Sequence, residues 1–368
     1  MSASHDAPLL EVRDLKMYFH TQDGVVKAVD GVSYTLEAGE TLGVVGESGS
    51  GKSVTVMTIM GLTPMPPGKI HGGDVRFKGQ SMLEMTNKQL RDLRGNHIAM
   101  IFQDPLSSLN PVQRVGKQVG EGLVLHKGYR KKQAFHRAVE LLDMVGIPNA
   151  AQRARDYPHQ FSGGMRQRAM IAMALACDPE ILIADEPTTA LDVTIQAQIL
   201  ELMQEMQRLH GTAIIMITHD LGVVADMADY IMVMYAGKPV EYGTTDQIFY
   251  NPLHPYTWGL MRSIPKRTLD DDQPLTPIMG NPPSLIDLPE GCAFAPRCPY
   301  VAERCSREDP AMVAVEGIHA SACFFSDSLD FLQNAPIYDG QRAEEAAAEG
   351  AGGRAEEAAA EGAGGHDG

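Results

Sequence analysis

The sequence predicts a mixed α/β fold in which a parallel sheet carries polar residues at one edge. Three short apolar runs, at residues 41–45, 181–184 and 213–218, have the continuous aliphatic character of parallel strands that are buried on both faces. Each run leads into a glycine-rich or polar segment. Helical segments, among them residues 54–60 and 165–176, lie between the runs. This alternation of apolar strands with helices is typical of α/β proteins.

The first polar segment is a glycine-rich loop that matches the pattern G-x-x-x-x-G-K-[ST] at every constrained position. At a strand-to-helix turn, backbone N–H groups point inward and bind phosphate, and glycine lets the phosphate approach closely. We expect Lys52 to reach the β- and γ-phosphates of ATP and Ser53 to ligate Mg²⁺. The alternative, a purely structural turn, is disfavoured by the complete pattern and its flanks. The loop residues expected to bind ATP are Gly46, Ser48, Gly49, Ser50, Gly51, Lys52 and Ser53.

Two carboxylates, Asp185 and Glu186, end the apolar run at residues 181–184. We expect Asp185 to hold Mg²⁺ through water and Glu186 to polarise the water that attacks the γ-phosphate. For the pair taken alone, a solvated acidic turn before Pro187 is the alternative. Because ligands of open α/β sheets gather at the carboxyl ends of the strands, where the phosphate loop also lies, we favour the catalytic interpretation.

A Ser-Gly-Gly element, formed by Ser162, Gly163 and Gly164, lies directly before the helix predicted at residues 165–176. The exposed N–H groups and the positive dipole end of that helix favour an anion. A helix cap without a ligand is the alternative, since serine is a favoured capping residue.

The phosphate loop, the Asp-Glu strand end and the sequence Phe-Ser-Gly-Gly-Met at residues 161–165 together resemble the ATP-binding-cassette family. The resemblance implies a cassette-type P-loop ATPase with a RecA-like core, an antiparallel β part near the front and a helical subdomain at about residues 104–161. It also implies that two such domains close face to face over ATP. In that arrangement Ser162, Gly163 and Gly164 of one subunit hold the γ-phosphate bound by the other.

The same resemblance assigns four further residues. Gln103 follows the strand-like run at residues 97–102 and matches the family's glutamine loop, which touches Mg²⁺ and the attacking water. His219 matches the switch histidine that hydrogen-bonds the γ-phosphate, and Asp192 matches the loop that crosses the dimer interface. Phe19 lies where an aromatic ring stacks on adenine, although a core aromatic is the alternative there. The implied catalytic residues are Glu186, His219 and Gln103, and the implied Mg²⁺ ligands are Ser53, Gln103 and Asp185.

Two stretches indicate a branch of the family. Residues 102–111 and 251–257 resemble hallmarks of dipeptide/oligopeptide importer ATPases, and their Pro and Ser content predicts loops. This resemblance implies an ATP-hydrolysing subunit that powers an importer of di- or oligopeptides, with nickel or another solute as the alternative cargo. The implied partners are a second ATPase, homologous or identical, in a head-to-tail dimer, two transmembrane permease subunits and an extracytoplasmic peptide-binding protein. The implied location is the cytoplasmic face of the inner or plasma membrane, peripheral through the permeases.

Composition disfavours other classes of protein. The formal net charge of −16 over 368 residues argues against nucleic acid as a ligand. A nucleic-acid-associated switch ATPase would show two cassettes, or a long coiled-coil insertion, and basic patches, none of which is visible. A free-standing phosphate-loop kinase is opposed by the Ser-Gly-Gly element. No run of 18 apolar residues and no charged-then-apolar leader is found, so we expect a chain that neither spans the membrane nor is exported.

Four of the five cysteines crowd into the C-terminal region: Cys292, Cys298, Cys305 and Cys323. The Pro- and Gly-rich sequence around them has few apolar side chains to bury in a core. We therefore expect thiolate ligation of a metal to stabilise the fold of this segment. The spacing fits neither the common zinc modules nor the usual ferredoxin run, which leaves Zn²⁺, iron–sulfur and, third, paired disulfides open. The resemblance to the peptide-importer branch favours a [4Fe–4S] cluster, with zinc as the alternative. Cys177 is interpreted as a small buried hydrophobe.

The organisation expected from these motifs has three parts. A nucleotide-binding domain spans residues 1–269, a Cys-containing extension spans 270–330, and a disordered acidic tail spans 331–368. In the tail, residues 342–353 and 354–365 are one twelve-residue sequence repeated, which offers no apolar face to bury.

Overall fold

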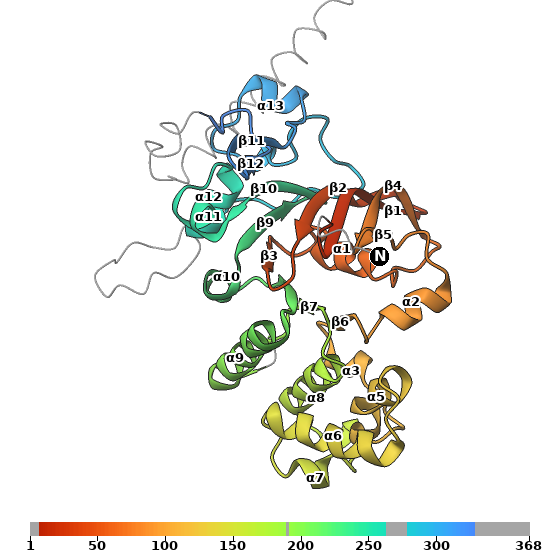
Figure 1. The fold of residues 1–368 in the computed structure, drawn as a ribbon. Helices are drawn as coiled ribbons and strands as arrows, with labels where there is room; N and C mark the ends of the chain where they lie inside the picture. Colours follow the sequence, from red (N-terminus) through yellow and green to blue (C-terminus); the bar gives the residue numbers. More distant parts are fainter. Residues whose placement is uncertain (1–6, 189–190, 263–277, 328–368) are drawn as a thin grey trace, which may run out of the picture.

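Two β-sheets and the helices around them make up the part of the chain that the structure, a computed structural model, describes: residues 7–188, 191–262 and 278–327 (Figure 1). The strands are β1 (Leu10–Thr21), β2 (Gly24–Leu36), β3 (Thr41–Val45), β4 (Gly68–Phe77), β5 (Gln80–Ser81), β6 (Ile98–Ile101), β7 (Ile181–Asp185), β8 (Ala213–Ile217), β9 (Tyr230–Tyr235), β10 (Lys238–Thr244), β11 (Val313–Glu316) and β12 (His319–Ser321). The helices are α1 (Lys52–Ile59), α2 (Asn87–Leu93), α3 (Pro105–Ser108), α4 (Val115–Val119), α5 (Glu121–His126), α6 (Lys131–Met144), α7 (Ala150–Arg153), α8 (Gly163–Leu175), α9 (Val193–His210), α10 (Leu221–Met227), α11 (Thr245–Tyr250), α12 (Pro255–Arg262) and α13 (Glu303–Arg307), with 3₁₀ segments at Pro158–Gln160 and Ala295–Arg297.

The larger sheet has the strand order β11-β12-β10-β9-β3-β8-β7-β6. From β9 to β6 every neighbouring pair is parallel. Strands β3, β7 and β8 are buried along their whole length, which explains their continuous apolar sequences. Because these strands run in one direction, the segments that follow them meet at a single edge of the sheet, and the site forms there.

The smaller sheet is antiparallel, with the order β2-β1-β4-β5. A tight hairpin joins β1 to β2, in which Thr21 pairs with Gly24. Inward side chains such as Leu10 and Val12 of β1 belong to one buried cluster with Val44 of β3 and Ile59 of α1. The smaller sheet therefore packs over α1 and one face of the larger sheet.

Helices α3 to α8 gather in the lower part of the molecule, away from the smaller sheet (Figure 1). The buried positions of α6, among them Ala134, Ala138 and Leu142, recur at helical spacing and form an apolar stripe. This stripe shares a buried cluster with Met170 of α8, and Cys177 lies in the same cluster, as expected of a small hydrophobe. The helical part thus has its own core, which continues onto the larger sheet.

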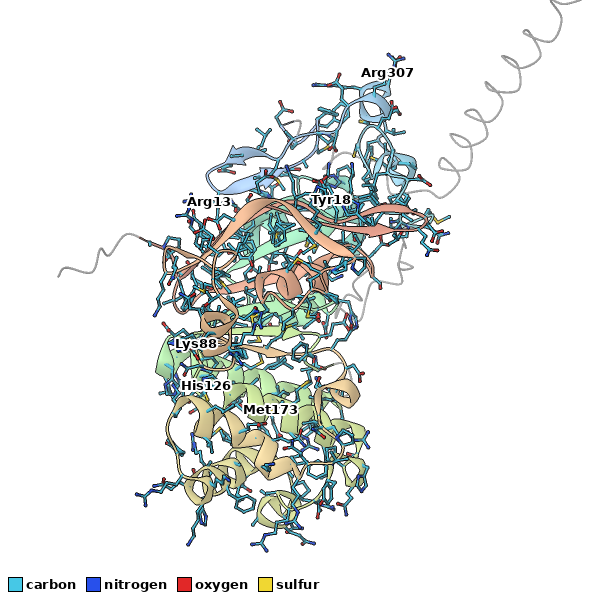
Figure 2. The ribbon with its side chains drawn as sticks, turned by 90° about the vertical axis from the view of Figure 1, so that its right-hand side faces the viewer. Arg13, Tyr18, Lys88, His126, Met173 and Arg307 are labelled. Carbon is cyan, nitrogen blue, oxygen red and sulfur yellow. The ribbon has the colours of Figure 1, made fainter. Side chains whose placement is uncertain are left out.

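The cysteine-bearing extension is continuous with the larger sheet. Strand β12 pairs with β10, and β11 completes a hairpin at the edge of the sheet. The ring of Phe294 packs edge-on against Tyr235 of β9 at a centroid distance of 5.3 Å, within one buried cluster. In the side view, Arg307 of α13 lies at the end of the molecule opposite His126 of the helical part (Figure 2).

The structure confirms the predicted mixed α/β fold with an antiparallel sheet and a helical part. The loops predicted at residues 102–111 and 251–257 are each wrong in part, because Pro105 begins α3 and Pro255 begins α12; proline suits the first turn of a helix. The boundary expected at residue 269 and the acidic tail expected at 331–368 lie outside the described residues. None of the helices that are described has the length and apolar composition to cross a membrane.

Candidate active site

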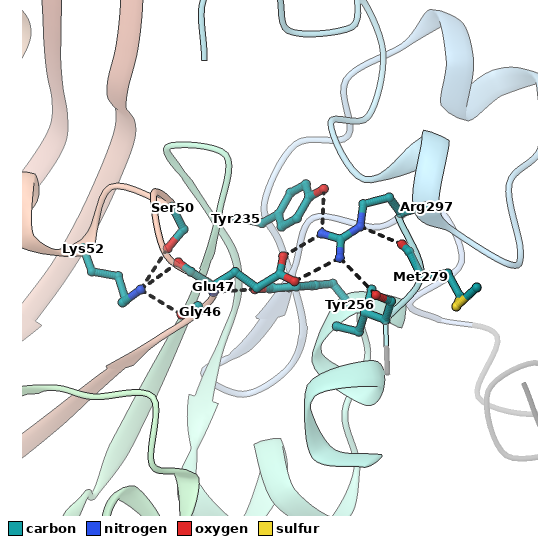
Figure 3. Close-up of polar contacts among 9 residues, drawn as sticks. Gly46, Glu47, Ser50, Lys52, Tyr235, Tyr256, Met279 and Arg297 are labelled. Atoms are coloured by element: carbon teal, nitrogen blue, oxygen red, sulfur yellow. Dashed lines mark hydrogen bonds and ion pairs between the residues drawn. The ribbon is translucent and has the colours of Figure 1, made fainter. Parts of the chain in front are cut away.

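The phosphate loop connects β3 to α1 and depends on glycine at two positions. Gly46 has φ +148° and Gly51 has φ +98°, and a Cβ at either would come within 2.2 Å of a backbone oxygen. Lys52 Nζ donates hydrogen bonds to the carbonyl oxygens of Gly46 (2.7 Å) and Glu47 (2.8 Å), so the ammonium lies inside the loop (Figure 3). Burial lowers the pKa of Lys52, and the carboxylates of Glu186 and Asp185 oppose that effect.

Ser53 and Asp185 bring two oxygen donors together at the start of α1. The Ser53 hydroxyl donates to Asp185 Oδ1 over 3.0 Å, across 132 positions of sequence. Burial raises the pKa of Asp185, since the Ser53 hydrogen bond offsets only part of the desolvation and the Glu186 charge adds to it. Hard cations prefer oxygen ligands, and a divalent cation would stabilise this buried carboxylate. These donors therefore fit Mg²⁺.

Glu186 is the point at which three residues from different strand ends meet. Gln103, which follows β6, donates its amide N–H to Glu186 Oε2 over 3.0 Å. His219, which follows β8, has Nδ1 at 3.6 Å from Glu186 Oε1. Glu186 itself has φ +48°, and its N–H donates to the Ile217 carbonyl of β8 over 2.8 Å, which fixes the turn after β7. The three residues expected to be catalytic are thus assembled in one place.

The Ser-Gly-Gly element forms the N-terminus of α8. Ser162 is the N-cap, and its hydroxyl accepts a hydrogen bond from the Met165 N–H at 3.3 Å. A Cβ built on Gly163 would meet no atom within 4 Å, so this helix start is open. The helix is attached to the segment that follows β7, because the buried Gln167 donates to the Pro187 carbonyl over 2.7 Å. The anion expected here stays a prediction.

Two further predicted residues have structural roles in the chain itself. Asp192 caps α9, with its carboxylate accepting from the Ile195 N–H at 3.0 Å. Phe19 is half-buried in β1 and packs against the cluster under the smaller sheet. Its contact with adenine stays a prediction. Thr189 and Ala190, next to Asp192, lie outside the described residues.

The four cysteines of the extension are free thiols that line one small cavity together with Phe294 and Phe324. Burial, with a smaller contribution from the neighbouring thiols, raises the pKa of Cys298 to about 12 and that of Cys323 to about 11. Within the described ranges, no group of three or more His, Cys, Asp or Glu side chains has a geometry that could hold a metal ion. The four thiols thus converge on one cavity, and the metal centre expected there stays a prediction.

Comparison with known proteins identifies the family. A model described as ABC transporter matches residues 29–189, and one described as oligopeptide/dipeptide transporter, C-terminal region, matches residues 240–305. The oligopeptide transport ATP-binding protein OppD of Bacillus subtilis (strain 168) is 54% identical over 311 residues, which cover 84% of this chain and 87% of that protein. The chain belongs to the ABC transporter family.

This ABC transporter chain is also similar to a dipeptide transport protein and to a solved ATP-binding cassette. The dipeptide transport ATP-binding protein DppD of Bacillus subtilis (strain 168) is 50% identical over 342 residues, covering 93% of this chain and 98% of that protein. The solved dimeric structure of the post-hydrolysis state of the ATP-binding cassette MJ0796, bound to ADP and Pi, is 26% identical with a TM-score of 0.59 and covers 64% of this chain and 98% of that one. The chain is accordingly an ABC ATPase, which uses ATP and Mg²⁺.

One contact to the phosphate loop could not be predicted from the sequence of this ABC transporter chain. Glu47, at an unconstrained position of the loop pattern, accepts two hydrogen bonds from Arg297 of the extension, at 2.6 and 2.9 Å. Its N–H donates to the Tyr256 hydroxyl of α12 over 2.8 Å. The only sequence signal was that Glu47 lies inside the motif and Arg297 lies beside Cys298; nothing indicated that they pair.

Proposed function

We propose that this chain is the ATP-binding and ATP-hydrolysing subunit of an importer for di- or oligopeptides. The observation that carries the hydrolytic part is the convergence of Gln103 and His219 on Glu186, beside the Ser53–Asp185 pair. The peptide cargo is supported by the relatives, since proteins named for oligopeptide and dipeptide transport match this chain over 87% to 98% of their own length.

In this proposal each residue near the phosphate loop has a distinct task. Loop N–H groups and Lys52 bind the phosphates, while Ser53, Asp185 and Gln103 hold Mg²⁺, which neutralises charge on the phosphate oxygens. Glu186 accepts the proton of the attacking water, because its carboxylate is already fixed by Gln103. His219, whose side chain is 68% exposed, is free to turn toward the γ-phosphate.

A second subunit completes the site in this proposal. The N-terminus of α8 at Ser162, Gly163 and Gly164, which is open at Gly163, offers the backbone N–H groups of its first turn to the γ-phosphate of an opposite cassette, and Asp192 faces the interface. The dimeric form of the solved relative bound to ADP and Pi supports this arrangement. The second subunit is a copy or a homologue.

The rest of the assembly consists of two permeases and an extracytoplasmic peptide-binding protein. The chain lies on the cytoplasmic face of the membrane, and nucleic acid is not a partner. In the nucleotide site, Phe19 stacks on the adenine.

We also propose that Cys292, Cys298, Cys305 and Cys323 bind a [4Fe–4S] cluster. The support for this proposal is that the four thiols line one cavity of the extension. A [4Fe–4S] cluster takes four thiolate ligands, which is the number of thiols that line this cavity. Its role is to hold the extension together, because this segment has few regular elements of its own.

The anaerobically purified chain should be brown and should contain about four iron and about four sulfide per chain. Cys298→Ser should bleach it, whereas the control Cys177→Ala, in the separate core of the helical part, should keep the colour. Metal and sulfide analysis with visible absorption measures both. If the analysis found one zinc and no iron, the site would be a zinc site and not a cluster. If it found two disulfides and no metal, both the cluster and the zinc site would be excluded.

Peptide uptake tests the proposed function in cells. Lys52→Ala removes the ammonium that holds the phosphates, so uptake of a radiolabelled tripeptide should fall to the level of a deletion strain. The control Lys88→Ala, on an exposed position of α2, should leave uptake unchanged. If the Lys52→Ala strain took up peptide normally but lost nickel uptake, the cargo would be nickel. If it took up both normally, the role of this chain in an importer would be contradicted.

A further inference from the structure

One buried arginine connects the cysteine-bearing extension to the phosphate loop. Arg297 ends the 3₁₀ segment Ala295–Arg297 and directly precedes Cys298. Its side chain is only 4% exposed, and it forms a two-pronged ion pair with Glu47 at 2.6 and 2.9 Å (Figure 3). Parallel N–H···O bonds of this kind fix orientation as well as charge.

The rest of the guanidinium is anchored within the extension and β9. Nε donates to the Met279 carbonyl at 2.9 Å, Nη1 to the Tyr235 hydroxyl at 3.3 Å and Nη2 to the Ile278 carbonyl at 3.4 Å. With the two bonds to Glu47, these contacts use all the N–H groups that an arginine has. The position of Arg297 is therefore set by the fold of the extension and does not depend on Glu47 alone.

Glu47 carries this connection into the nucleotide site. Its carbonyl accepts from Lys52 Nζ at 2.8 Å, and its N–H donates to Tyr256 at 2.8 Å. A single residue thus separates Arg297 from the lysine that holds the phosphates, as the run of contacts in Figure 3 shows. The loop is held on one side by the extension and on the other by its own lysine.

The opposite charges of Glu47 and Arg297 affect the binding of ATP. An unpaired carboxylate in the phosphate loop would repel the triphosphate, and the repulsion would be strong in this partly buried place. The Arg297 guanidinium cancels it. We infer that Arg297 is a positioning residue of the nucleotide site, which keeps Glu47 neutralised and the loop fixed, so that ATP affinity depends on the folded extension. The inference rests on the proposed binding of ATP at this loop.

The test is ATP and ADP binding to the purified full chain, measured by calorimetry. Arg297→Gln should weaken ATP binding about tenfold, the order expected of one uncompensated charge in a partly buried site, and should weaken ADP binding less. Combining it with Glu47→Gln should restore most of the affinity, because the repelling carboxylate is then gone. The control Arg307→Gln, an exposed residue of the same extension that pairs with Glu303 in its own helix, should change nothing.

Each outcome decides between the inference and the function on which it rests. If Lys52→Ala abolishes binding and Arg297→Gln leaves it unchanged, the inference alone is overturned; if Lys52→Ala has no effect, the proposed ATP site fails first. Equal loss for ATP and ADP without recovery in the double variant would show a merely structural role and overturn the inference. Should Arg297→Gln fail to fold, Glu47→Gln decides: ATP binding should be no weaker than in the unchanged protein, and a tenfold loss would refute the charge argument.

Discussion

Replacing Glu186 by glutamine should reduce ATP turnover by more than about a hundredfold while ATP binding is retained. The amide oxygen can still accept the hydrogen bond that Gln103 donates over 3.0 Å, so the shape of the site is kept. The amide cannot take up the proton of the attacking water, and it no longer offers a negative charge to His219. Phosphate release with Mg²⁺ and ATP, and equilibrium binding of a fluorescent ATP analogue, separate the two effects.

The matched control is Glu205→Gln, which makes the same chemical change on an exposed position of α9. It should leave both turnover and binding unchanged. Near-normal turnover of the Glu186→Gln protein would contradict the role of Glu186 as the base, and loss of ATP binding would mean that the residue shapes the site instead.

Replacing Ser162 by arginine should leave ATP binding to the single chain intact but should block the ATP-dependent association of two chains. Ser162 is exposed at the start of α8, where a larger side chain has space in the single chain. In a closed dimer, that side chain would occupy the place of the γ-phosphate of the opposite subunit. Turnover should fall by about a hundredfold, the order found when a group that stabilises charge in a transition state is removed.

Sedimentation of the chain with and without ATP measures the association, and an ATP analogue measures the binding. Ser306→Arg is the control, because it makes the same chemical change on an exposed position of α13, outside the nucleotide site, and it should leave association and binding unchanged. If Ser162→Arg lost ATP affinity in the single chain, the site would be contained within one subunit.

The central strands and the active site were predictable because their signals are local. Strands such as β3, β7 and β8 are buried on both faces, so their sequences are continuous apolar runs with clear ends. Parallel topology then brings those ends together, and this is why Gln103, Glu186 and His219 were found in one place.

The contacts that were missed depend on chain topology. Glu47 and Arg297 are 250 residues apart, and neither local sequence indicates a partner. Helices begin at Pro105 and Pro255 where the sequence predicts loops, because proline marks both turns and helix starts. The thiols of the extension are brought together by irregular backbone. Such segments have no helical or strand periodicity in their sequence, so their contacts could not be predicted.

If each ATP is hydrolysed at a site built from two chains, mixing two variants that are inactive alone should restore one working site. Lys52→Ala lacks the phosphate-binding lysine, and Ser162→Arg blocks the opposite half of the site. A mixed dimer has one intact site, made of Lys52 from one chain and Ser162 from the other. ATP turnover should therefore reappear when the two purified variants are mixed. Turnover no greater than the sum of the two variants measured alone would contradict it.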